Sequence, residues 1–133
     1  MAEAVVATVH VAADPDRVFD FFTHPELMVR WMGEHAELDG RPGGRFAVDV
    51  RGTAVRGRFV VVERPSRLVF TWGHAGSDRL PPGASTVEVR LRPLEGGTLV
   101  ELEHRGLGEP EASGHRRGWQ HFLARLAADV IHK

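Results

Sequence analysis

Histidine and tryptophan are the side chains of this sequence with the most to offer for recognition or acid–base chemistry. His104 follows Val100 and Leu102 at alternating positions. We therefore expect it on the dry face of a strand, where a charge would be costly. One interpretation is a neutral histidine bonded to a backbone carbonyl. The other is a histidine that orients a polar group of a ligand or shuttles a proton, which a pKa of about 6.5 permits.

A second histidine shares a predicted helix face with a tryptophan. His115 lies four residues before Trp119, which places both side chains on one side of a helix. His104 and His115 could therefore meet near one mouth of a pocket. Two histidines without a third ligand do not indicate a metal site, so we expect neither a metal nor another cofactor.

No known catalytic arrangement is recognisable in the sequence. It contains no nucleophile elbow, no phosphate-binding loop and no dinucleotide fingerprint. No carboxylate falls on the predicted dry face of the sheet, which leaves a paired-carboxylate mechanism without support. We therefore assign no catalytic residue. A pocket enzyme such as a cyclase or hydrolase, with His104 as acid or base, remains the alternative.

Aromatic residues at inward positions complete a candidate binding site. Each of them taken singly reads as a core residue, but as a set they are typical of a site for a small apolar or aromatic molecule. The predicted ligand-binding residues are Trp31, Phe46, Phe70, Trp72, His104, His115, Trp119 and Phe122. The three indoles are expected to surround one cavity.

The elements before the predicted sheet follow from periodicity and capping signals. Alternation of β-branched residues predicts a strand over about 4–12. Asp14 and Pro15 then favour a helix start. The segment 23–26 matches a capping box, which predicts a second short helix that carries Trp31 and is ended by Gly33.

The remainder predicts an antiparallel meander followed by one long helix. Alternating strands fill the region from Glu34 to Arg105, with turns at 41–44, 52–53, 65–66 and 95–97 and a loop over 74–84. An apolar stripe from Trp119 to Ile131 predicts a helix that starts near 112–115. Because glycine weakens a helix interior by roughly 1 kcal/mol, we expect Gly118 to mark a close approach between helix and sheet.

Length, charge and composition narrow the class of protein. The 133 residues suit one domain over 1–133. With no cysteine, the chain has no disulfide or thiolate chemistry and fits a reducing cytoplasm. The formal charge of −1 gives no field that would attract nucleic acid or an anionic membrane. No segment is long and apolar enough to span a bilayer, and the N-terminus lacks the features of a signal peptide.

Several motifs in order resemble the START-like or SRPBCC superfamily, in the branch related to the activator of heat-shock-protein ATPase. These motifs are Asp14-Pro15 followed by Val18-Phe19, Phe22-Thr23, Pro25-Glu26 and Trp31, then Arg41 to Phe46, Thr98 to His104, and Gly118-Trp119 with Leu123 and Leu126. The resemblance covers nearly the whole chain. It implies an α+β helix-grip fold, in which a curved antiparallel sheet wraps a long C-terminal helix and encloses an apolar cavity.

The resemblance does not imply one activity, because this fold hosts several unrelated functions. Our first hypothesis is a cytoplasmic binding protein for a small apolar or aromatic molecule. The pocket enzyme and a co-chaperone-like interaction module that uses the outer face of the sheet are the alternatives. The eukaryotic co-chaperone carries a separate N-terminal domain, whereas here the first strand begins close to Met1, so we do not expect a chaperone partner. A homodimer is left open.

Overall fold

A computed structural model describes residues 4–131 of the chain. Seven strands form one antiparallel sheet in the order β1-β7-β6-β5-β4-β3-β2. The strands are β1 (Val5–Val11), β2 (His35–Leu38), β3 (Arg45–Val50), β4 (Thr53–Glu63), β5 (Arg67–Trp72), β6 (Ser85–Leu94) and β7 (Gly97–Arg105). The helices are α1 (Pro15–Thr23), α2 (Pro25–Met28) and α3 (Glu111–Val130).

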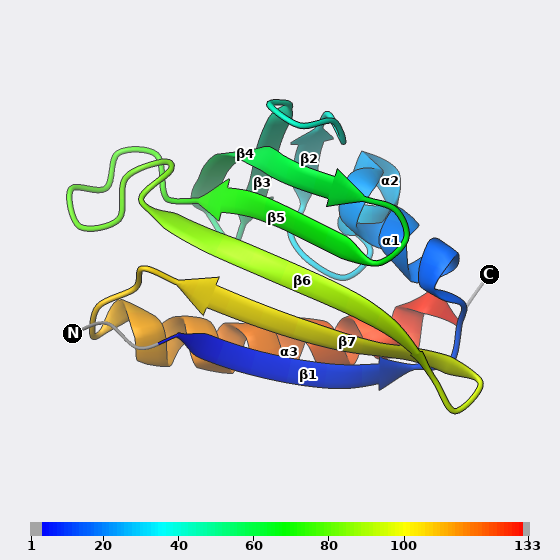
Figure 1. Cartoon of the computed structure of the whole chain (residues 1–133). Coiled ribbons are helices and arrows are strands. Elements are labelled where there is room, and N and C mark those ends of the chain that lie inside the picture. Colours follow the sequence, from blue (N-terminus) through cyan, green and yellow to red (C-terminus); the bar gives the residue numbers. More distant parts are fainter. Residues whose placement is uncertain (1–3, 132–133) are drawn as a thin grey trace.

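The long helix α3 runs beside β1 and β7, while α1 and α2 sit together near one end of the sheet (Figure 1). This is the predicted α+β helix-grip arrangement, in which the curved sheet wraps the C-terminal helix. Within residues 4–131, no helix is long and apolar enough to cross a membrane.

The predicted dry face of the sheet is confirmed. Its side chains are buried on three neighbouring strands: Leu68, Phe70 and Trp72 on β5, Val87, Val89 and Leu91 on β6, and Val100, Leu102 and His104 on β7. The register places Trp72 opposite Ser85 and His104 opposite Val87. Since alternate residues of a strand share a face, Ser85 comes to lie diagonally beside His104.

The predicted stripe of α3 is confirmed except at its end. Trp119, Leu123, Leu126 and Val130 are buried against the sheet. Ile131 was expected to continue the stripe, but it lies beyond the last helical residue and is 56% exposed. The helix ends one residue earlier than the apolar pattern does.

The capping-box prediction is wrong. Thr23 is the last residue of α1, and its hydroxyl donates to the carbonyl of Phe19, 3.4 Å away. A threonine inside a helix commonly bonds back to the carbonyl four residues earlier, so its hydroxyl does not cap the next helix. That helix is only four residues long, and Trp31 lies in the turns after it. Gly33 does adopt the expected left-handed conformation, with φ of 85°.

The cap of α1 departs from the prediction, whereas β2 is a strand that the sequence reasoning did not assign individually. Asp14 occupies the cap position of α1 but makes no side-chain cap bond. The strand β2 was included in the predicted sheet region without being assigned. It pairs with β3 at the sheet edge, and its short length and half-exposed pattern give little periodic signal.

Candidate functional site

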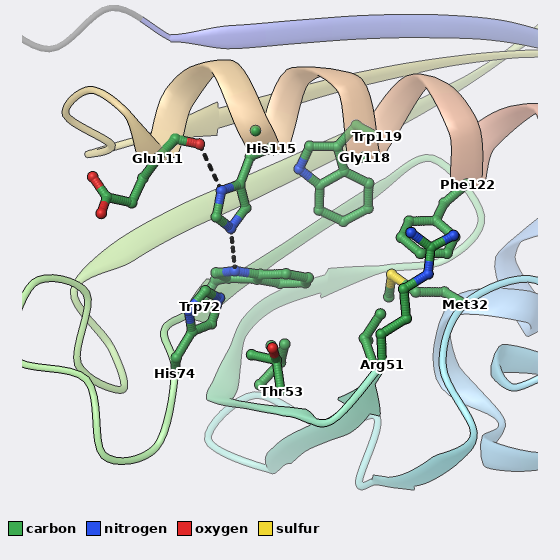
Figure 2. Close-up of a pocket in the computed structure, with 13 residues that line it drawn as sticks. Met32, Arg51, Thr53, Trp72, His74, Glu111, His115, Gly118, Trp119 and Phe122 are labelled. Atoms are coloured by element: carbon green, nitrogen blue, oxygen red, sulfur yellow. Dashed lines mark hydrogen bonds between the residues drawn. The ribbon is translucent and has the colours of Figure 1, made fainter.

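A cavity of about 340 Å³ opens between α3 and the sheet (Figure 2). Its wall is mostly apolar and aromatic, with polar groups at the two ends. The lining residues are Met32, Val50, Arg51, Thr53, Val55, Trp72, His74, Glu111, Gly114, His115, Gly118, Trp119 and Phe122. Its volume lies near the lower end of the range for small-molecule sites.

Two glycines of α3 keep the helix side of the cavity open. Gly114 and Gly118 both line it and are one helical turn apart. A Cβ built on either residue would meet no atom within 4 Å. The predicted close approach at Gly118 is therefore wrong. The missing side chains leave space instead of allowing contact, although glycine is unfavourable inside a helix.

Trp72 and His115 form the cavity wall through a defined hydrogen bond. The carbonyl of Glu111 accepts a bond from His115 Nδ1 at 2.7 Å, so the ring proton is on Nδ1. Nε2 is then an acceptor, and Trp72 Nε1 donates to it at 3.3 Å (Figure 2). Both nitrogens of a neutral His115 are therefore engaged. The Trp72 and Trp119 rings meet with centroids 5.1 Å apart.

His104 lies behind this wall in a satisfied hydrogen-bond chain. Trp119 Nε1 donates to its Nδ1 at 3.0 Å. Its Nε2 therefore carries the proton and donates to Ser85 Oγ at 2.8 Å, while that hydroxyl donates to the Trp72 carbonyl at 2.8 Å. Burial first, then the neighbouring His115 and His74, lowers the pKa of His104 to about 3. His104 is thus neutral and does not line the cavity.

The histidine end of the cavity also contains His74. Its ring stacks on His115 with centroids 5.5 Å apart. Partial burial and the neighbouring His115 lower the pKa of His74, although Glu111 opposes the shift. The Glu111 carboxylate is paired with Arg79 at 3.1 Å. Burial at this end of the cavity therefore disfavours a positive charge on the imidazole of His74.

Arg51 occupies the opposite end, beside Phe122 and Met32 (Figure 2). It lies in the two-residue turn between β3 and β4, where Val50 pairs with Thr53. The backbone N–H of Arg51 donates to Glu34 Oε1 at 2.9 Å. Its guanidinium lies 5.5 Å from the Phe122 ring centroid and 3.3 Å from His121 Nε2.

Four of the eight predicted site residues line the cavity, namely Trp72, His115, Trp119 and Phe122. The other four lie in the core. Trp31 is fully buried and donates to the Phe21 carbonyl at 3.0 Å, so the prediction that three indoles surround one cavity is wrong. Phe46 and Phe70 stack on each other with centroids 4.2 Å apart. The inward orientation predicted for Trp72 and His104 is confirmed.

The sequence reasoning missed four polar lining residues: Arg51, Thr53, His74 and Glu111. Arg51 lies in a turn, His74 starts a loop, and Thr53 and Glu111 are the first residues of β4 and α3. At such positions no periodicity shows which way a side chain points. The isolated bridge between Val55 and His74 is what brings this histidine back to the sheet. Within residues 4–131, no three metal-ligating side chains are grouped so as to hold a metal ion.

The chain has clear relatives. Residues 12–130 match the family model described as Activator of Hsp90 ATPase homolog 1-like protein. The human activator of 90 kDa heat shock protein ATPase homolog 1 is 28% identical over 109 residues, which are 81% of this chain. The match covers only 31% of the human protein, so this chain spans about a third of that relative.

Solved structures agree with the family match. An AHSA1-like protein from Rhizobium etli is 41% identical, with a TM-score of 0.79 over 100% of this chain and 84% of that chain. DynU16, a protein in the dynemicin biosynthetic locus, is 26% identical, with a TM-score of 0.83 over 97% of this chain and 47% of that chain.

Proposed function

The chain belongs to the family of Activator of Hsp90 ATPase homolog 1-like proteins, and within that family we propose that it is a cytoplasmic binding protein for a small apolar or aromatic molecule. The observation that carries this proposal is the cavity whose helix wall is left open by Gly114 and Gly118. Filling the space with alanine or leucine side chains would strengthen both the helix and the packing. A cavity that is kept open despite this loss of stability favours a ligand-binding role.

The aromatic wall supports the same class of ligand. Trp72, Trp119 and Phe122 present ring surface to the cavity. A planar apolar molecule that enters loses contact with water and gains aromatic contacts worth about 0.5–1.5 kcal/mol per pair beyond the burial of area. The relative in a biosynthetic locus is consistent with a small-molecule ligand.

The tryptophans allow a direct test by nuclear magnetic resonance. We expect the neutral probe 2-naphthalenemethanol to shift the indole N–H signals of Trp72 and Trp119. The signal of Trp31, which is buried away from the cavity, serves as an internal reference. Equal shifts of all three signals, or no shift at millimolar probe, would count against the proposal.

Filling the cavity should abolish this binding. Gly118→Leu places a side chain in the space that the probe would occupy. Gln120→Leu adds the same side chain to an exposed position of the same helix and is the matched control. We expect loss of probe binding in the first variant and wild-type affinity in the second, with circular dichroism used to establish that both are folded. Undiminished binding by Gly118→Leu would contradict the assignment of the cavity as the site.

Chaperone activation is a second candidate, favoured by the 28% identity to the human activator. Because the chain spans about a third of that protein, the question is whether the shared part can act by itself. An ATPase assay of an Hsp90-type chaperone with and without this protein tests the candidate. If this protein increases the ATP turnover of the chaperone, and Gly118→Leu increases it equally, the activity would reside in an interaction surface and not in the cavity.

A further inference from the structure

The cavity is electrically asymmetric along its length. Arg51 lies at the end next to Phe122, whereas the carboxylate of Glu111 lies at the other end, beyond His115 (Figure 2). The carboxylate already has a cationic partner, because Arg79 Nε is 3.1 Å from it. A ligand with a charged group would therefore meet different environments at the two ends.

Within the described residues, the guanidinium of Arg51 has no ion-pair partner, because the neighbouring Glu34 carboxylate accepts from the backbone N–H of Arg51 instead. Among the described residues 4–131, no carboxylate lies within 4.0 Å of it, and its contacts are the neutral acceptor His121 Nε2 and the ring of Phe122. A guanidinium has five N–H donors in a planar fork that matches a carboxylate. One bond to His121 leaves most of these donors available to a ligand.

The cation at the opposite end, Arg79, is already paired with the Glu111 carboxylate. Both ring nitrogens of His115 are engaged with Glu111 and Trp72, as a neutral ring requires. The pKa of His74 is lowered by burial and by His115, although Glu111 opposes the shift. Arg51 is the one arginine or lysine among the residues that line the cavity.

A hydroxyl lies on the same hairpin as the arginine. Thr53 lines the cavity two residues beyond Arg51. No hydrogen bond of its hydroxyl to the part of the chain between residues 4 and 131 is found, which leaves it able to donate to an incoming oxygen. The β3–β4 hairpin therefore presents two kinds of donor next to the aromatic wall.

We propose that the ligand is an aromatic acid, whose rings pack against Trp72, Trp119 and Phe122 and whose anionic group binds Arg51. This inference rests on the proposed function, because it assigns a chemical class to the occupant of the same cavity. The orientation follows from the charges, since the anionic end avoids Glu111 and faces the guanidinium.

Two probes with the same rings separate the charge from the apolar contact. 2-Naphthoate carries a carboxylate, whereas 2-naphthalenemethanol carries a neutral hydroxymethyl group at the same position. We expect wild-type protein to bind the naphthoate at least about five-fold more tightly at neutral pH and low salt, because charge-assisted hydrogen bonds exceed neutral ones in strength. Since Arg51 is exposed, the preference should shrink as salt is added.

Arg51→Gln should bring the ratio of the two dissociation constants to within about two-fold, since it removes the charge that carries the preference. Arg117→Gln removes the same charge from an exposed position of α3 outside the cavity and should keep the wild-type ratio. A wild-type protein that binds both probes equally, or a preference that survives in Arg51→Gln, overturns the aromatic-acid assignment while the binding function stands. Failure of wild-type protein to bind either probe overturns both.

Discussion

Two tryptophan–histidine hydrogen bonds determine which imidazole nitrogens carry a proton in the wall between the cavity and the core. Trp119 donates to His104 and Trp72 donates to His115. Each indole is a donor only, so the histidine nitrogen that receives the bond cannot also carry a proton. Protonation of either ring would place two donors face to face. At the scale of single residues, the site therefore depends on neutral imidazoles.

The stability of the protein should fall as the pH drops below about 6.5, because of His104. In the unfolded chain this histidine takes up a proton near its ordinary pKa of about 6.5, whereas its pKa in the folded state is about 3. Between these values the unfolded state binds more protons, so acid favours unfolding. For this group we expect a loss of about 2 kcal/mol of unfolding free energy between pH 6.5 and 5, measured by urea denaturation.

His104→Gln is the variant that isolates this contribution. Glutamine can still accept from Trp119 and donate to Ser85 but does not titrate. The wild type, measured in the same buffers, is the reference. The pH dependence of this variant should therefore be flatter by about the same 2 kcal/mol. Parallel curves for the two proteins would show that His104 is not held neutral in the folded state.

At the scale of elements, α3 both closes the core and opens the cavity. Its Leu123, Leu126 and Val130 are buried against the sheet. Nearer the N-terminus of the helix, Gly114 and Gly118 face empty space. A single helix therefore supplies both packed core residues and the open wall of the cavity.

Gly118→Ala should stabilise the protein. The added methyl group meets no atom within 4 Å, and alanine is favoured over glycine in a helix interior by roughly 1 kcal/mol. Thermal denaturation should show a melting temperature higher by about 3–5 °C. A lower melting temperature would mean that the added methyl group clashes with the sheet, and that the space beside Gly118 is not open.

The same change should weaken ligand binding slightly, since the methyl group takes up part of the cavity. The stability of the free protein and the affinity for the probe would then move in opposite directions. This contrast is expected where a gap is kept for a ligand, and it would be absent if the glycine were incidental.

At the scale of the whole molecule, one continuous core joins the sheet, α1 and α3. Phe19 and Phe22 of α1, Phe46 and Phe70 of the sheet, and Leu126 of α3 belong to the same buried cluster. The cavity borders this cluster: Trp72 and Trp119 belong to both, whereas Phe46 and Phe70 stack on each other and do not line the cavity.

A shared core of this kind should unfold in one cooperative step. We expect the urea transitions followed by tryptophan fluorescence and by far-ultraviolet circular dichroism to coincide, as for other single domains of this size. Trp31 reports on the region of α1, whereas Trp72 and Trp119 report on the cavity. A separate earlier transition in fluorescence would show that the helix-grip region opens independently.

The sheet, the terminal helix and the family resemblance could all be recognised from the sequence. Alternation on the strands of Phe70, Val89 and Leu102 identified the dry face, because burial on one side of a sheet imposes a period of two. The predicted stripe from Trp119 to Ile131 identified α3 in the same way, although it ran one residue past the end of the helix. These periodicities are local, so they can be recognised without knowing which elements pack against each strand or helix.

Only the tertiary structure decided which inward side chains face the cavity and which fill the core. Trp31 and Trp72 both read as inward aromatics, yet one bonds to the Phe21 carbonyl and the other lines the cavity. Gly118 is compatible with close contact or with empty space, and the choice depends on what lies opposite. Arg51 reaches the cavity from a turn. Each outcome depends on which atoms of distant segments come into contact. The spacing of residues along the chain does not reveal such contacts.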